Sequence, residues 1–342
     1  MSQNKTNSDN INIIYAGVDV AKLTLELNLG EVNYSLANET KDHRRIMKLL
    51  AEAEKAEPGS KVHVIVEATG GYEAKLVRAL QEAGRLVSVI QPSRVRHFAY
   101  AKNQRAKTDR IDAPILSQFG QAIRPTPTEA PSQAQSRLSE LVDRRAQLVQ
   151  SHSAELNRAG HYIDRFLCRQ SRQLLALIDR QIKACDKAIA AQIAADEGMK
   201  TRAKRVQEVP GVGPVVAAVL QAAMPELGTL SDTEAAALAG LAPYNYDSGP
   251  RQGSRRIWGG RAQVRCALYM AAMSGVRHDP ILKHFYLRLR AAGKKPMLAL
   301  TAAMRKQIVL LNRLLKNPDF KLAARTKTSS ASAAQAQHVC TN

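Results

Sequence analysis

Residues 11–20 read INIIYAGVDV and residues 61–70 read KVHVIVEATG, and these two stretches decide the fold of this chain. Both are rich in β-branched residues, which indicates buried strands. Asp19 lies at the end of the first strand and Glu67 at the end of the second. Because neighbouring parallel strands end at the same edge of a sheet, we expect the two carboxylates to face one another.

The segments around these strands predict a mixed sheet. Residues 24–30 and 32–39 alternate apolar and polar side chains as paired strands do, with Gly30 near the turn. Residues 43–56 and 71–84 have helical periodicity, 85–92 reads as a further strand, and 93–122 reads as largely helical, interrupted by Pro114. The resulting order, βββαβαβα, favours an RNase H-like sheet over a doubly wound dinucleotide-binding unit, and no G-x-G-x-x-G follows the first strand.

The remainder of the chain reads as helical. Three prolines in RPTPTEAPSQ, residues 124–133, predict a boundary near residue 125. From Ser136 to about Lys200 apolar residues recur at steps of three and four, which predicts a long helical hairpin. This hairpin is either a layer packed on its domain or a coiled-coil arm for oligomerisation. The predicted organisation is a disordered leader (1–14), an α/β domain (15–125), the arm (126–200), a mainly helical C-terminal domain (201–322) and a disordered tail (323–342).

The composition indicates a polyanionic partner. Lys and Arg number 50 against 30 Asp and Glu, for a net charge of +20 and a pI near 10.0. Nucleic acid is the leading candidate, and an anionic membrane surface or simple solubility is the alternative. The four cysteines form no C-x-x-C pair, so neither a zinc site nor a disulfide framework is expected. With no apolar run long enough to span a membrane and no signal-peptide pattern at the start, we expect a cytoplasmic protein, associated with the nucleoid.

A second pair of carboxylates lies in the segment KTDRIDA. Asp109 and Asp112 are three residues apart, so they share one face of a helix. With Asp19 and Glu67 they would repel one another strongly unless cations neutralise them, and such hard oxygen ligands favour Mg²⁺ or Mn²⁺. Two such ions can assist phosphodiester cleavage. Taken singly, each acidic residue fits equally well as a turn, cap or solvated helix residue, and Glu73, the nearest rival to Glu67, reads as an ordinary surface residue.

Basic residues that could hold phosphates crowd the same region. They are Arg94, Arg96, Lys102, Arg105, Lys107 and Arg110.

The C-terminal domain carries two further phosphate-binding candidates. In VPGVGP, Gly211 and Gly213 resemble a helix-hairpin-helix turn, in which backbone amides at a helix start bind a phosphate. A tight turn before an apolar helix is the alternative. Further on, Ser248 lies in a Gly-rich loop followed by arginines, namely Arg251, Arg255, Arg256, Arg261 and Arg265. Residue chemistry alone makes Ser248 a phosphate-contacting serine, because no neighbouring His or Lys offers a base, and Ser254 is a second candidate.

The ordered set of motifs GVDVAK, VEATGGY, KTDRIDA, VPGVGP and GLAP with YDSG resembles the DEDD transposases of the insertion sequence 110 family, which are related to Piv-type DNA invertases. The resemblance runs from about Tyr15 to Phe320. It implies a RuvC-like N-terminal domain whose acidic tetrad maps onto Asp19, Glu67, Asp109 and Asp112, joined by a coiled coil to a family-specific C-terminal domain.

The resemblance also implies that Ser248 is a nucleophile that becomes covalently linked to DNA. It implies further that two subunits of a dimer or tetramer complete each site, and that a structured guide RNA pairs with element-end and target DNA. One departure is visible, because relatives often carry a basic residue where this chain has residues 257–260, and Trp258 there could stack on a base. A transposase is therefore the expected function. An invertase or junction resolvase and a non-catalytic nucleic-acid-binding protein remain alternatives.

Overall fold

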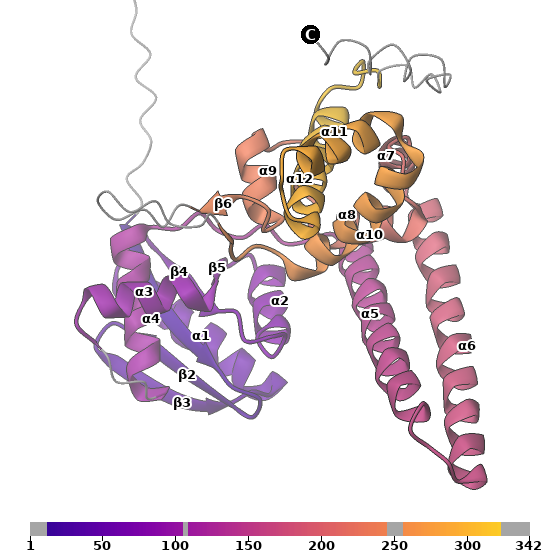
Figure 1. Cartoon of the computed structure of the whole chain (residues 1–342). Coiled ribbons are helices and arrows are strands. Elements are labelled where there is room, and N and C mark those ends of the chain that lie inside the picture. The colour runs from indigo at the N-terminus through magenta and orange to yellow at the C-terminus, as the bar shows by residue number, and fades with distance from the viewer. Residues whose placement is uncertain (1–11, 105–108, 245–255, 323–342) are drawn as a thin grey trace, which may run out of the picture. The chain divides into compact units, whose positions relative to one another are not determined.

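The computed structural model describes residues 12–104, 109–244 and 256–322, with only the backbone described for 109–111 (Figure 1). Contacts divide the chain into two units, residues 1–130 and 131–342. The predicted leader boundary at residue 14 falls inside the first strand, because Asn12–Ile14 already pair with a neighbouring strand. The predicted tail lies outside the described residues.

A five-stranded mixed sheet forms the first unit. Its strands, in the order β3-β2-β1-β4-β5, are β1 (Asn12–Val20), β2 (Thr24–Leu29), β3 (Val32–Ala37), β4 (Ser60–Glu67) and β5 (Leu86–Ile90). The first three strands are antiparallel neighbours, whereas β1, β4 and β5 run parallel. The predicted sequence of elements is confirmed, and so is the α/β character of this region.

Helices cover both faces of the sheet. On one face α1 (Thr40–Ala56) and α2 (Ala74–Glu82) contribute Ile46, Leu50, Leu76 and Leu80 to a core with Val18 and Val64. On the other face α3 (Pro92–Ala101) and α4 (Asp109–Ile123) pack around Ile65, Leu116 and Phe119. Residues of β1 and β4 therefore alternate between two buried layers, which explains their continuous apolar sequence.

Gly17 allows α4 to lie directly against β1. A Cβ atom at Gly17 would lie 2.1 Å from the carbonyl oxygen of Ala113 and 2.6 Å from the amide nitrogen of Ser117. Farther along α4, Gly120 packs against the ring of Tyr15 in the same way. The close contact fixes both the height and the direction of α4 on the sheet.

The predicted interruption at Pro114 is wrong. Pro114 lies inside α4, and the break between α3 and α4 begins earlier, around Lys102–Gln104, where Asn103 adopts a left-handed conformation with φ 58°. Pro114 is the sixth residue of α4, so the helix continues through it although the proline cannot donate to the carbonyl of Arg110.

In its described residues, 131–244 and 256–322, the second unit is helical apart from a two-residue ladder between β6 (Pro243–Tyr244) and β7 (Arg256–Ile257). The predicted hairpin is confirmed as α5 (Gln133–Ala159) and α6 (Arg165–Ala195), which lie side by side (Figure 1). At the end of the hairpin away from its turn, Leu138, Val142 and Ile189 pack with Ala218 from the rest of the unit. The expected domain start at residue 201 falls inside the next helix, which runs from Glu197 to Gln207.

The remaining helices enclose one large core. They are α7 (Glu197–Gln207), α8 (Pro214–Ala223), α9 (Asp232–Leu238), α10 (Ala262–His278), α11 (Pro280–Ala291) and α12 (Pro296–Lys316). Leu220, Leu268 and Leu311 are buried at its centre. In the described ranges no helix is long and apolar enough to cross a membrane, and Cys168, Cys185 and Cys266 are free thiols, while Cys340 lies outside them.

Replacing Gly17 with Ala should destabilise the first unit. The added methyl group collides with α4 backbone, so we expect a loss of about 1–3 kcal/mol in the free energy of unfolding, measured by urea denaturation. Gly160→Ala is the matched control, because Gly160 has helical φ and a Cβ there would meet nothing closer than 3.6 Å. Equal stability of Gly17→Ala and wild type would show that α4 does not rest on this residue.

Candidate active site

The carboxylates Asp19 and Glu67 follow the last pair of the β1–β4 ladder. That pair is Val18 with Val66, so Asp19 and Glu67 are the next residues on adjacent parallel strands. Val18 and Val66 belong to the core on the α1 and α2 side. Because side chains alternate along a strand, Asp19 and Glu67 point to the opposite face, where α4 packs, and both are partly buried there.

The start of α4 lies at the same edge of the sheet. Gly120 lies over Tyr15, and residues 113–117 lie against Gly17, so α4 runs antiparallel to β1. Two strand residues advance about 6.6 Å and four helix residues about 6 Å. Moving two residues along β1, from Gly17 to Asp19, therefore corresponds to moving about four residues back along α4. Residues 113–117 lie beside Gly17, so residues 109–112 lie at the level of Asp19.

Asp112 is partly buried within that first turn, whereas Asp109 is described by its backbone alone. Among the residues whose side chains are described, no group of three or more His, Cys, Asp or Glu is arranged to hold a metal ion. Asp19, Glu67 and Asp112 are among those residues, so the three side chains do not form such a group by themselves. The side chain of Asp109 lies outside the described residues.

One carboxylate that the sequence analysis missed faces the same side of the sheet. Glu26 of β2 pairs directly with Asp19 in the antiparallel ladder, so their side chains share a face. Its Oε1 accepts a hydrogen bond of 2.6 Å from the hydroxyl of Ser35. The alternation in TLELNLG could have revealed it, because Glu26 is the one charged side chain on that strand.

The expected phosphate-binding residues near α3 have other contacts. The guanidinium of Arg94 lies 5.5 Å from the ring centre of Phe119, and the ammonium of Lys102 lies 5.8 Å from that of Phe98. Both cations therefore stack on the aromatic core below α3 and α4. The side chains of Arg105, Lys107 and Arg110 lie outside the described residues.

The two glycines of VPGVGP have different environments. Gly211, with φ 89°, lies so close to α10 that a Cβ would be 2.2 Å from the carbonyl oxygen of Ala271. Gly213 precedes α8 as its N-cap, and a Cβ there would meet nothing within 4 Å. Packing against α10 accounts for Gly211, so the open helix start is the part of the motif that could meet a phosphate.

The loop with Ser248, Arg251, Ser254 and Arg255 lies outside the described residues. Its two flanks are described, and they are joined by the β6–β7 pairs Pro243 with Ile257 and Tyr244 with Arg256. Arg256 and Trp258 are exposed on the second flank.

Models of known protein families match parts of both units. A family model for DEDD transposases of the IS110 type matches residues 16–168, and a model for transposases of the IS116/IS110/IS902 family matches residues 203–287. Together these matches cover more than half of the chain. The chain belongs to the IS110 family of transposases.

Curated relatives agree with this membership. The transposase is 24% identical to the pilin gene-inverting protein of Moraxella bovis over 306 residues, which is 86% of this chain and 94% of the relative. It is 25% identical to the protein of the same name from Moraxella lacunata over 73% of this chain and 79% of the relative. A protein of insertion element IS116 from Streptomyces clavuligerus is 30% identical over 49% of this chain and 41% of the relative.

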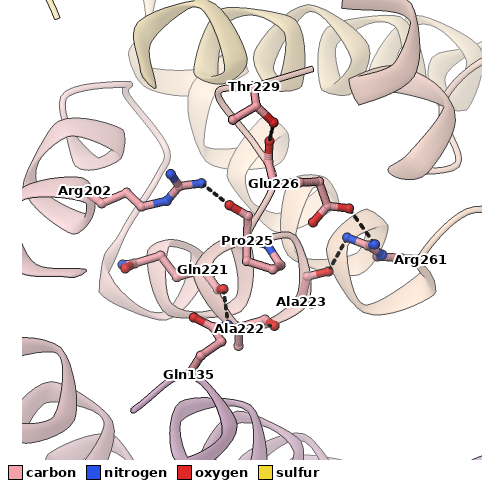
Figure 2. A network of polar contacts seen from close by, with 9 residues as sticks. All are labelled: Gln135, Arg202, Gln221, Ala222, Ala223, Pro225, Glu226, Thr229 and Arg261. Carbon is pink, nitrogen blue, oxygen red and sulfur yellow. Dashed lines mark hydrogen bonds and ion pairs between the residues drawn. The ribbon is translucent and has the colours of Figure 1, made fainter. Parts of the chain in front are cut away.

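Arg261, which we expect to contact nucleic acid, also has partners within the transposase (Figure 2). Its guanidinium donates to the carbonyl oxygen of Ala223 at 2.8 Å and pairs with Glu226 at 2.5 Å. The side-chain amide of Gln135 and the guanidinium of Arg202 bind other carbonyls at the same end of α8. Gln135 and Arg261 thus satisfy carbonyls that the end of α8 leaves without partners, while Arg202 binds the carbonyl of Pro225 just beyond the helix.

Glu73 is also more than the surface residue that the sequence predicted. Its Oε2 accepts hydrogen bonds from the Thr69 amide at 3.1 Å, the Thr69 hydroxyl at 2.9 Å and the Gly71 amide at 2.8 Å. Partial burial raises the pKa of Glu73, but these hydrogen bonds to its ionised form outweigh that effect and leave the pKa below 4.5. One carboxylate thus shapes the loop that follows Glu67.

Replacing Glu73 with Gln should destabilise the transposase at neutral pH and not at low pH. A carboxylate whose pKa is lower in the folded state than in the unfolded state stabilises the fold at every pH above its unfolded-state pKa. This stability is lost as the pH falls through the folded-state pKa. We expect a loss of roughly 1 kcal/mol at pH 7 that shrinks as the pH falls below the usual range of a glutamate pKa, measured by urea unfolding as a function of pH. A difference independent of pH would contradict the role of the ionised form.

Replacing Arg261 with Ala should lower stability in the absence of any nucleic acid. The carbonyl of Ala223 loses its donor and Glu226 its partner, at a cost of about 1–3 kcal/mol, measured by thermal and urea unfolding. A double-mutant cycle with Glu226→Ala isolates the ion pair. Arg256→Ala, at an exposed arginine of the same segment, is the control, and equal stability of the two Ala variants would return Arg261 to the set of surface contacts.

Proposed function

We propose that this transposase cleaves and rejoins DNA at element ends and target with a divalent-metal carboxylate site and a serine nucleophile. Asp19, Glu67, Asp109 and Asp112 are the carboxylates, Ser248 is the nucleophile, and Mg²⁺ or Mn²⁺ is the ion. The observation that carries the proposal is the adjacency of Asp19 and Glu67 on β1 and β4 at the edge where α4 begins.

The topology supports an RNase H-like, or RuvC-like, identity for the first unit. Three antiparallel strands are followed by two parallel crossovers in the order 3-2-1-4-5. The carboxyl ends of the central parallel strands are where such α/β sheets bind ligands. Asp19 and Glu67 stand at those ends.

The chemistry of the carboxylate donors would suit a hard cation. Asp19 and Glu67 are the next residues after the last β1–β4 pair, and Glu26 lies opposite Asp19 on the same face. These side chains and that of Asp112 are not grouped to hold an ion by themselves, so the proposal needs Asp109 as well. Like charges opposite one another in a sheet are destabilising unless a cation offsets them. When bound there, Mg²⁺ or Mn²⁺ would supply positive charge for the attacking and leaving oxygens of a phosphodiester.

Ser248 would carry the covalent step. Its Oγ forms a bond to phosphorus while one P–O bond to a deoxyribose breaks, and the hydroxyl proton is lost as the released sugar oxygen gains one. The reverse reaction, from a new sugar hydroxyl, rejoins the DNA. The transposase family model that covers residues 203–287 includes this loop, and the β6–β7 pairs hold its flanks together.

The positive charge supports nucleic-acid partners. A net charge of +20 favours binding to DNA backbone and, by the family resemblance, to a structured guide RNA that pairs with donor and target. Lys107, Arg110, Arg251, Arg255 and Arg256 are the proposed contacts. Gly213 at the start of α8 adds a phosphate site of the helix-hairpin-helix kind. DNA as substrate would place the protein in the cytoplasm at the nucleoid.

The hairpin supports self-association into a dimer or tetramer. Val149, Leu156 and Ile163 recur every seven residues along α5 and its turn, and they are 38%, 54% and 96% exposed. A seven-residue apolar repeat fits another helix in a coiled coil. The stripe begins beside an apolar groove lined by Val149, Val215 and Met270, so we infer that a second copy of the chain covers it.

Site-specific inversion is the second candidate function. The Moraxella bovis relative, named for pilin gene inversion, is matched over 94% of its length. Cleavage and rejoining are the same chemistry in both roles. Inversion of a segment flanked by two sites, in place of excision of an element, would identify an invertase.

The proposal predicts a covalent protein–DNA product. Purified protein is incubated with Mg²⁺, candidate guide RNA and labelled element-end DNA, and the products are separated on a denaturing gel. Wild type should give a protein-linked band, and Ser248→Ala and Asp19→Asn should each reduce it by on the order of a thousandfold or more.

Ser254→Ala and Asp319→Asn are the matched controls and should retain the band. Asp319 is exposed near the end of the described chain. Intact, unlinked DNA in all metal and RNA conditions would overturn the proposal, and a band that depends on Ser254 would move the nucleophile.

A further inference from the structure

A single side-chain amide links the loops that follow Asp19 and Glu67. The nitrogen of the Asn38 side chain lies 3.0 Å from the carbonyl oxygen of Ala21 and 3.2 Å from that of Tyr72. Ala21 is two residues beyond Asp19, and Tyr72 lies in the loop between Glu67 and α2. The two acceptors are far apart in sequence, so the bonds are tertiary and not those of a local turn.

The position of this link matters because the backbone ladder stops short of the carboxylates. The last pair between β1 and β4 is Val18 with Val66. Beyond it, Asp19 continues alongside β2 and Glu67 alongside β5, which are the neighbours on opposite sides. Asn38 connects the two chain segments again, past the point where their ladder ends.

His43 fixes the orientation of the Asn38 amide. The Nε2 of His43 lies 2.9 Å from the Oδ1 of Asn38. Because the amide nitrogen of Asn38 donates to two carbonyls, its oxygen is the acceptor, so Nε2 of His43 must carry a hydrogen. Burial in α1 and the nearby charge of Lys75 lower the pKa of His43, which favours the neutral ring with the hydrogen on Nε2.

The rest of this link is held equally firmly. The backbone amide of Asn38 donates to the carbonyl of Leu23 at 2.9 Å, and that of Ala37 donates to the Asp42 carboxylate at 2.8 Å. On the far side, Glu73 organises the loop that presents the Tyr72 carbonyl. Neither end of the Asn38 bridge therefore depends on a freely rotating group.

We propose that Asn38, oriented by His43, is a positioning residue that holds together the chain segments following Asp19 and Glu67, so that the two carboxylates can share a divalent cation. This inference rests on the metal role proposed above for the two carboxylates. Outer groups that orient metal-binding side chains typically change metal affinity about 10–100-fold when removed.

The test measures Mn²⁺ binding to the full-length protein by isothermal titration calorimetry. Asn38→Leu, which keeps the size of the side chain and removes both donors, should weaken Mn²⁺ binding about tenfold or more. His43→Leu should act in the same direction, whereas His43→Gln, which retains a donor, should restore binding close to the wild-type value. Asn38→Ser is a milder second variant, because its short side chain cannot reach both carbonyls.

Asn33→Leu is the matched control. It removes one side-chain hydrogen bond, with Asn28, on the same β2–β3 hairpin but away from the two loops. Wild-type affinity in Asn38→Leu, or an equal loss in Asn33→Leu, would overturn the positioning role while leaving the metal site standing. Absence of Mn²⁺ binding by the wild-type protein would instead overturn the proposed function on which the inference rests.

Discussion

The contact between the backbone of Gly17 and α4 is the constraint on which the candidate site depends. A glycine at the centre of β1 lets a helix lie on the sheet at backbone distance, and the approach leaves no room for even a methyl group. Gly120 makes a similar contact with Tyr15, two residues before Gly17 on β1. Two contact points fix both the direction of α4 and its distance from the sheet. Four helix residues back from the contact at Gly17, residues 109–112 reach the level of Asp19. The position of α4 relative to Asp19 and Glu67 is thus a consequence of close packing at Gly17 and Tyr15. A change of shape in such a tightly packed interior is costly.

Much of this first unit was predictable because its signals are local and repeated. β-Branched runs indicated β1 and β4, turn residues marked their ends, and the positions of Asp19 and Glu67 followed from the parallel pairing. The three-residue spacing of Asp109 and Asp112 predicted a shared helix face in the same way. What failed was the effect of Pro114, since sequence rules treat proline as a helix breaker. The structure places it near the start of α4, and the chain breaks instead at Asn103, whose left-handed backbone has no strong signature.

Some side chains have partners within the chain that the sequence could not indicate, because those partners are distant in sequence. Arg261 follows a glycine-rich loop among other arginines, and nothing near it predicts that it would bind Ala223 and Glu226 (Figure 2). Gly211 sits in a motif known for exposed amides, yet α10 packs on it. Asn38 is a similar case, because the two carbonyls that it binds, those of Ala21 and Tyr72, come from separate loops. Glu73 differs, because its partners at Thr69 and Gly71 are only four and two residues away in the sequence.

Using some arginines internally does not weaken the case for a nucleic-acid partner. Even if every acidic side chain paired with a basic one, the excess of 20 positive charges would remain. Affinity for phosphate backbone grows with the number of such contacts and not with any one of them. Arg261 can therefore cap α8 while neighbouring basic residues meet DNA or RNA. The division is consistent across both units: the groups that must stay in place are bound to backbone carbonyls or amides, and the charge that must reach a mobile, sequence-varied partner is left on the surface. Under the proposed function, specificity would come from base pairing by the proposed guide RNA, and the protein would contribute the positions of a small number of fixed side chains.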